Sequence, residues 1–189
     1  MKTDNGNMQS KLTLRRHFLE RYHADSNPSV LDCCAGEQKI WKELRKTCEC
    51  SYLGIDKKEI KGTLKMDSVK YLQRGHGAAF DIIDIDTYGC PFRHLAAVVR
   101  YIRKPTTVFL TFGLKGVGSI NGEALTALGI NFPVPRAIAA ELSEKLLGDV
   151  IVGIVHPHTI EYMTEAPCGS SENRDRGRFT RYVGLRIIP

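Results

Sequence analysis

The sequence predicts an α/β protein built on one doubly wound, mostly parallel sheet. Short apolar segments alternate with helical patterns along the 189 residues of the chain, which is typical of this class. The first apolar segment passes through a glycine turn directly into a helical pattern, and four segments end in an acidic residue. Because a chain of this length can bury a single core under a central sheet, we expect one domain and one functional site.

The first half of the chain supplies the repeated strand and helix units. Residues 9–22 space Leu12, Phe18 and Leu19 at helical intervals, which predicts an amphipathic helix packed on the domain. We therefore divide the chain into an N-terminal helical segment, residues 1–28, and a main domain, residues 29–189. The first four predicted strands cover residues 30–35, 51–55, 62–66 and 79–85.

The second half continues the alternation. It contains predicted helices at residues 92–102 and 138–147, and predicted strands at residues 106–110, 150–155 and 182–188. Residues 113–135 carry several glycines and exceed the usual connection length, so they form a candidate functional loop. The polar, arginine-rich composition of residues 168–178 predicts a mobile segment between the last two strands.

Composition and charge narrow the class of protein. The chain is 42% hydrophobic and 25% charged, as in ordinary globular proteins, and no apolar run approaches the roughly 20 residues that span a bilayer. The polar start MKTDNGNMQS lacks the apolar core of a secretory signal, so we expect a cytoplasmic protein. A net charge of +6 and a pI near 9.0 favour an anionic partner such as nucleic acid.

The six cysteines indicate reduced thiols rather than a disulfide framework, because nothing marks the chain for export. The pairs Cys48-x-Cys50 and His156-x-His158 lack the CxxC spacing that is typical of zinc sites. The sequence therefore predicts no metal site.

Carboxylates at the strand ends define the candidate site, because ligands of open α/β sheets bind outside the carboxyl ends of the strands. Asp32 precedes Gly36, where the backbone can pass close to a ligand without a Cβ in the way. Asp56, at the end of the second strand, can accept hydrogen bonds from both hydroxyls of a ribose. Asp67 can accept one from the amine of an adenine, while the Ser68 backbone contacts the ring.

The loop after the first strand indicates a nucleoside without a pyrophosphate. Residues 35–39 contain one glycine where a dinucleotide-binding fingerprint has three. Glu37 in the same loop would repel a phosphate group. NAD and ATP are therefore poor fits.

Three segments resemble motifs of one enzyme family. VLDCCAG (residues 30–36) and YLGID (52–56) are similar to the first and second motifs of class I S-adenosylmethionine-dependent methyltransferases, and FDIIDIDTYGCP (80–91) is similar to their fourth. The resemblance covers residues 29–115. It implies a Rossmann-like methyltransferase fold, with a mostly parallel seven-stranded sheet and an antiparallel C-terminal hairpin, and S-adenosylmethionine as cofactor. The cofactor-binding residues it implies are Asp32, Cys33, Cys34, Ala35, Gly36, Asp56, Lys57, Asp67, Ser68 and Asp84.

The fourth motif further resembles that of tRNA N2,N2-guanine dimethyltransferases, Asp-x-Asp-Pro-aromatic-Gly-Ser-Pro. The matching positions are Asp84, Asp86, Tyr88, Gly89 and Pro91. The resemblance implies catalytic roles for Asp86, which would accept the N–H bonds of the substrate amine, and for Tyr88, which would stack on an extruded base. Two departures from the family are Thr87 in place of its proline and Glu37-Gln38 in place of small residues.

The expected activity is methyl transfer to an exocyclic amine of a nucleic-acid base, with RNA, such as guanine N2 of tRNA, favoured over DNA. Basic residues in three clusters are candidates for binding phosphates. They are Lys11, Arg15 and Arg16; Arg100, Arg103 and Lys104; and Arg174, Arg176, Arg178 and Arg181.

Three alternatives remain open at the level of sequence. A DNA adenine or cytosine N-methyltransferase usually carries Asn/Asp-Pro-Pro-aromatic in its fourth motif, and this chain has no proline at residues 87 and 88. A methyltransferase-like binding domain without turnover would explain Thr87 and the altered first loop. A small-molecule methyltransferase is the third, because one fold hosts many substrates.

Overall fold

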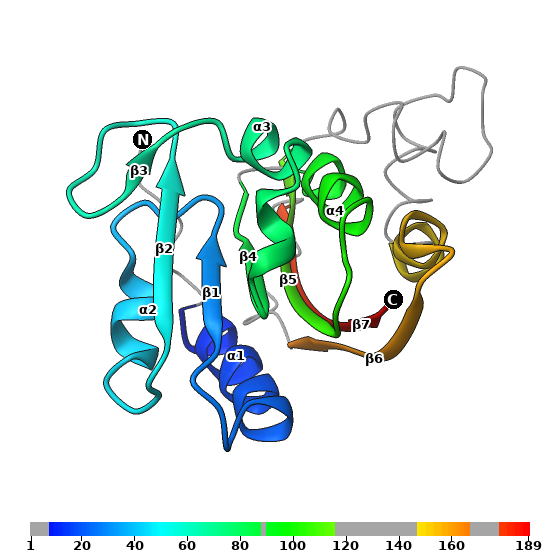
Figure 1. Cartoon of the computed structure of the whole chain (residues 1–189), viewed down its shortest axis with the longest axis horizontal. Helices are drawn as coiled ribbons and strands as arrows, with labels where there is room; N and C mark the ends of the chain where they lie inside the picture. The colour runs from blue at the N-terminus through cyan, green and yellow to red at the C-terminus, as the bar shows by residue number, and fades with distance from the viewer. Residues whose placement is uncertain (1–7, 88–89, 116–146, 167–177) are drawn as a thin grey trace.

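The computed structural model describes residues 8–87, 90–115, 147–166 and 178–189, which form a seven-stranded sheet in the order β3-β2-β1-β4-β5-β7-β6 (Figure 1). The strands are β1 (Ser29–Asp32), β2 (Ser51–Asp56), β3 (Leu64–Lys65), β4 (Ile82–Ile85), β5 (Thr106–Lys115), β6 (Thr159–Ala166) and β7 (Arg178–Ile188). Strands β1 to β5 pair in parallel, and β7 pairs antiparallel with both β5 and β6. This topology confirms the predicted fold class.

Helices cover both faces of the sheet (Figure 1). They are α1 (Met8–Tyr22), α2 (Lys39–Leu44), α3 (Ser68–Gln73) and α4 (Phe92–Val99), with a 3₁₀ turn, η1 (His76–Ala79), and a helix at residues 147–155. Helices α1 and α2 pack on one hydrophobic cluster, whereas α3, α4 and residues 147–155 pack on another. None of the described helices combines the length and apolarity needed to cross a bilayer.

The C-terminal hairpin forms with a different partner strand from the one predicted. Residues 150–155 are helical rather than extended, because Val150, Ile151 and Val155 lie at helical spacing in the core and Val152 is exposed. The partner of β7 is β6, a half-exposed edge strand with weak apolar alternation. Residues 113–115 of the predicted loop belong to the end of β5. Three predicted segments lie outside the described residues: the rest of that loop, residues 138–146 of the predicted helix, and residues 168–177 of the arginine-rich tract.

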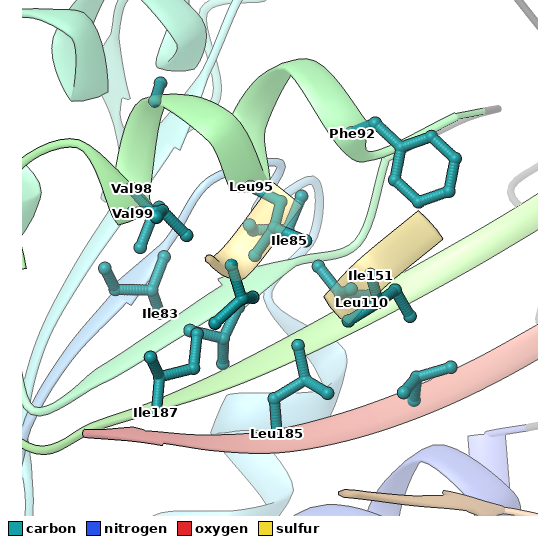
Figure 2. Close-up of a cluster of buried hydrophobic side chains, with 14 of the residues drawn as sticks. Ile83, Ile85, Phe92, Leu95, Val98, Val99, Leu110, Ile151, Leu185 and Ile187 are labelled. Atoms are coloured by element: carbon teal, nitrogen blue, oxygen red, sulfur yellow. The ribbon is translucent and has the colours of Figure 1, made fainter. Parts of the chain in front are cut away.

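Strand β4 divides its side chains between the two faces of the sheet. Ile83 and Ile85 point toward α4 and pack with Leu95 and Val98, as Figure 2 shows. Ile82 faces the cluster under α1, and Asp84 faces the same side because side chains alternate along a strand. The carboxylates of the fourth motif therefore lie under α1.

Helix α1 is packed as tightly as the rest of the core. Phe18 is fully buried, and its ring meets Phe109 of β5 edge to face at a centroid distance of 5.4 Å. A Cβ at Gly184 of β7 would lie 2.8 Å from Cζ of Phe18, so only glycine leaves room for this ring. Helix α1 packs on the sheet of the main domain. The division of the chain at residue 28 stays a prediction.

Candidate active site at the carboxyl ends of the strands

The turn after β1 is tied to the end of β2. Gly36, at a φ of 49°, donates its backbone N–H to Oδ2 of Asp56 at 3.1 Å. The backbone N–H of Ala35 donates to the carbonyl of Ile55 at 3.0 Å. The predicted glycine turn and the predicted ribose-binding carboxylate are thus brought together by the protein itself.

The loop after β1 contains Glu37 and Gln38, the two residues that depart from the pattern of the family. Gln38 adopts a left-handed conformation with a φ of 59°, and its side-chain amide donates to the carbonyl of Lys61 at 3.1 Å. Glu37 is 69% exposed and pairs with Lys39, so its carboxylate points to solvent. A Cβ at Gly54 would lie 2.9 Å from that of Ala35, so the glycine of the second motif allows the loop to pack on β2.

Asp67 and Ser68 begin α3. Asp67 accepts a hydrogen bond from the backbone N–H of Lys70 at 3.2 Å, as a helix N-cap does, and its other oxygen lies 3.0 Å from Nζ of Lys57. Ser68 is buried, with its hydroxyl close to Cys34. Burial raises the pKa of Cys34 to about 12, so this thiol stays protonated.

His94 is a site residue that the sequence reasoning missed. Its Nε2 lies 2.9 Å from the Ser68 hydroxyl, while its buried Nδ1 has no hydrogen-bond partner among the described residues. Burial, with Lys57 and Arg93 nearby, lowers the pKa of His94 to about 4, so the ring is neutral near pH 7. Its position in the first turn of α4, directly after the fourth motif, was the available signal.

Asp84 forms a buried ion pair with Arg15 of α1. The guanidinium donates to both carboxylate oxygens, at 2.7 and 2.6 Å, and Nε1 of Trp41 donates to one of them at 2.7 Å. The side chains of Arg15 and Asp84 are 1% and 2% exposed. The expectation that Arg15 binds phosphate at the surface is therefore wrong, and Asp84 is held by three hydrogen bonds from within the protein.

Asp86 is paired with Lys11, one turn earlier on α1. The ammonium lies 2.7 and 2.6 Å from the two carboxylate oxygens. Burial favours the neutral acid, but Lys11 and Arg15 outweigh it and lower the pKa of Asp86, so the carboxylate is ionised. The next residue, Thr87, has a buried hydroxyl with no partner among the described residues. Tyr88, predicted to stack on the base, lies outside the described residues, as does Gly89.

Asp32 completes a row of three carboxylates. It sits beside Asp84 in the parallel register of β1 and β4, and the hydroxyl of Tyr52 donates to it at 2.9 Å. Burial and the charge of Asp84 raise its pKa well above the usual range. The neighbouring Cys33 side chain lies in the core, so Cys33 presents only its backbone to the site.

Several of the predicted phosphate-binding residues also contact protein groups, and their binding of phosphate stays a prediction. Lys104 pairs with Asp81 at 2.7 Å, and Arg181 pairs with Glu165 at 2.7 Å. Arg103 donates to the carbonyl of Ile102. Arg174 and Arg176 lie outside the described residues.

Comparison with known proteins places this geometry in a fold class. No protein-family description matches the sequence, and no curated protein matches it. Solved structures match over nearly the whole chain. Trm1 from Pyrococcus horikoshii, in complex with S-adenosyl-L-methionine, has a TM-score of 0.63 at 13% identity, and the match covers 98% of this chain and 56% of that one.

Two further neighbours are methyltransferases with other substrates. The plantazolicin methyltransferase BpumL has a TM-score of 0.55 at 12% identity, covering 98% of this chain and 87% of that one. The 1,6-didemethyltoxoflavin-N1-methyltransferase of Burkholderia thailandensis has a TM-score of 0.54 at 14% identity, covering 98% and 80%. Both were solved with a desmethyl substrate or its analogue and S-adenosylhomocysteine.

The strand order and these neighbours define the fold as that of class I S-adenosylmethionine-dependent methyltransferases, which confirms the resemblance seen in the motifs. The complex of Trm1 holds S-adenosyl-L-methionine, the cofactor that the motifs imply. The chain spans just over half the length of that protein.

Proposed function

We propose that this chain is an S-adenosylmethionine-dependent methyltransferase that methylates an exocyclic amine of a nucleic-acid base, with RNA favoured over DNA. The observation that supports it most is the Gly36 turn bonded to Asp56, with Asp86 at the end of the neighbouring β4, in the strand order of class I methyltransferases. This arrangement offers a nucleoside site and an amine acceptor at one edge of the sheet.

The residues fit the cofactor. Each oxygen of Asp56 accepts one backbone N–H, from Gly36 or Lys58, and retains a lone pair for a ribose hydroxyl. Asp67 can accept the adenine amine beside the Ser68 backbone. The remaining proposed contacts come from the backbone of residues 33–35 and from Asp32, whereas Asp84 acts through its bonds to Arg15 and Trp41.

The chemistry proposed for the site is positioning. When bound, the cofactor supplies an activated methyl group on its sulfonium. Asp86 accepts an N–H bond from the substrate amine, draws its lone pair out of conjugation with the ring and aims it along the line of transfer. The amine would gain the methyl group as the carbon–sulfur bond breaks, with S-adenosylhomocysteine as the leaving group, and would lose one proton to Asp86 or water. Tyr88 is proposed to stack on the base.

The preference for RNA rests on two features of the chain. A net charge of +6 attracts polyanions, and the fourth motif resembles that of tRNA dimethyltransferases. A small molecule is the second candidate substrate, because BpumL and the toxoflavin enzyme share the fold and were solved with a desmethylPZN analogue and with 1,6-didemethyltoxoflavin. The cytoplasm is the compartment proposed for either reaction.

Calorimetric titration with S-adenosylmethionine and S-adenosylhomocysteine tests the cofactor site. Asp56→Ala should weaken both ligands by about 10- to 100-fold, because hydrogen bonds to a charged group contribute roughly 1.5–3 kcal/mol. Glu59→Ala, which removes a carboxylate that is 84% exposed, is the matched control and should bind as the wild type does. Circular dichroism of both variants checks that they remain folded.

Labelled methyl transfer then separates the candidate substrates. Methylation of total tRNA, located at guanine N2, supports the proposal. Methylation of DNA alone, or of small molecules alone, would replace it with those alternatives. Cofactor binding without methylation of any substrate indicates a binding domain, and absence of binding by the wild type contradicts the enzyme as proposed.

A further inference from the structure

The surroundings of Asp86 contain a group that the fourth motif does not supply. Lys11 reaches both of its oxygens from α1, at 2.7 and 2.6 Å. The side chain of Lys11 is 12% exposed and that of Asp86 is 25% exposed, so the pair is shielded but open on one side. Buried Thr111 of β5 lies beside the carboxylate, although its hydroxyl makes no hydrogen bond of good geometry with the described residues.

The spacing of charges on α1 matches the spacing of carboxylates along β4. Lys11 and Arg15 are four residues apart on a helix, which rises about 6 Å over that span. Asp84 and Asp86 are two residues apart in an extended segment, which spans roughly 6.6 Å and points both side chains to one face. The buried Arg15 pair therefore fixes the helix at the position that brings Lys11 to Asp86.

The charges around Asp86 oppose one another. From α1 come the cations Lys11 and Arg15; from the end of β1 come Asp32 and the protonated, uncharged thiol of Cys34; from β4 comes Asp84. Without Lys11, a single cation would face three carboxylates, and Asp86 would take up a proton more readily. A protonated acid has lost acceptor capacity, whereas the carboxylate paired with Lys11 keeps a free lone pair on each oxygen for an amine.

We propose that Lys11 is a positioning residue: its ammonium group keeps the Asp86 carboxylate ionised and oriented so that it can accept the substrate amine. This inference rests on the proposed function for its catalytic meaning. The ion pair itself exists in the protein independently of any substrate. Helix α1 is accordingly part of the active site rather than only a cover for the core.

The test compares Lys11→Met, Lys11→Gln and Lys11→Arg with a control, Lys46→Met, which removes an exposed lysine paired with Glu43. Carboxyl ¹³C NMR titration, assigned with Asp86→Asn, measures the pKa of Asp86 in each. The Met and Gln variants should raise it by about one to three units, whereas the Arg and Lys46 variants should stay within about half a unit of wild type. The acid limb of the pH profile of methyl transfer should move up by the same amount, with cofactor affinity unchanged.

The two readouts keep this inference separate from the proposed function. Absence of cofactor binding in the wild type defeats the proposed function, while the NMR titration still measures the link between Lys11 and Asp86. A pKa of Asp86 that is the same in Lys11→Met and Lys11→Gln as in the wild type overturns the inference. So does a raised pKa that leaves the acid limb of methyl transfer in place. Two neutral variants guard against one of them failing to fold.

Discussion

Replacing Arg15 by methionine should remove a large part of the stability of the fold. The variant keeps most of the side-chain volume but leaves Asp84, 2% exposed, with Trp41 as the one remaining side-chain donor among the described residues. Asp32 lies beside it in the sheet register, so a second carboxylate adds repulsion. The loss is therefore that of an uncompensated buried charge rather than of an ordinary ion pair.

The expected cost is about 3–5 kcal/mol, the range for removing one partner of a buried pair. For a chain of this size each kcal/mol shifts the melting temperature by about 2–4 °C, so Tm should fall by roughly 6–20 °C.

Denaturant unfolding followed by circular dichroism at pH 7.5 measures this loss. The double variant Arg15→Met/Asp84→Asn should recover part of it, since the carboxamide carries no charge to leave unpaired. Lys46→Met, which removes an exposed pair with Glu43, should cost less than about 1 kcal/mol. A loss in Arg15→Met no larger than in Lys46→Met would refute the reasoning.

Two further predictions concern packing and pH. Gly184→Ala should destabilise the fold by about 1–3 kcal/mol because the new methyl group overlaps the Phe18 ring. A second substitution in the same chain, Phe18→Leu, should recover part of the loss. If Gly184→Ala unfolds at the same denaturant concentration as the wild type, this prediction is wrong. Burial lowers the pKa of His23 and of His94 from 6.5 to about 4, so the unfolded chain binds more protons between these values and stability should fall as pH drops through this window. Each histidine should account for about 1–3 kcal/mol of the unfolding free energy lost as the pH drops through this window. The double variant His23→Gln/His94→Gln should therefore lose less stability than the wild type between pH 7 and the lower end of the window. An equal loss in the two proteins would count against this prediction.

Local patterns predicted most of the sheet. The parallel strands β1, β2, β4 and β5 contain short apolar segments, and each begins within three residues of its predicted start, although β5 continues five residues beyond its predicted end. The strand predicted at residues 150–155 was wrong because a short run of β-branched residues is compatible with either a strand or a buried helix. Contacts with the core favour the helix. Edge strand β6 was missed because its exposed face carries polar residues and its apolar alternation is weak.

The sequence predicted the positions of those candidate site residues that lie at the ends of strands. The carboxylates of Asp32, Asp56 and Asp86 follow from the rule that ligands bind where parallel strands end. The partners of Asp84 and Asp86 did not follow, because they come from α1, 69 and 75 residues away in the sequence. A lysine and an arginine in an amphipathic helix are usually solvated, and only the tertiary fold shows that these two face inward.

The packing of Phe18 against Gly184 also constrains the order in which the protein can be completed during synthesis. Helix α1 emerges from the ribosome before the strands of the sheet, yet the strand that accommodates its central ring, β7, follows all the other described strands in the sequence. Strand β6 pairs in the sheet with β7 alone among the described strands, so it too waits for the same segment. Helix α1 and the edge strand β6 therefore reach their final contacts together, after β7 has been synthesised, and until then the apolar face of α1 lacks the packing surface that β7 provides.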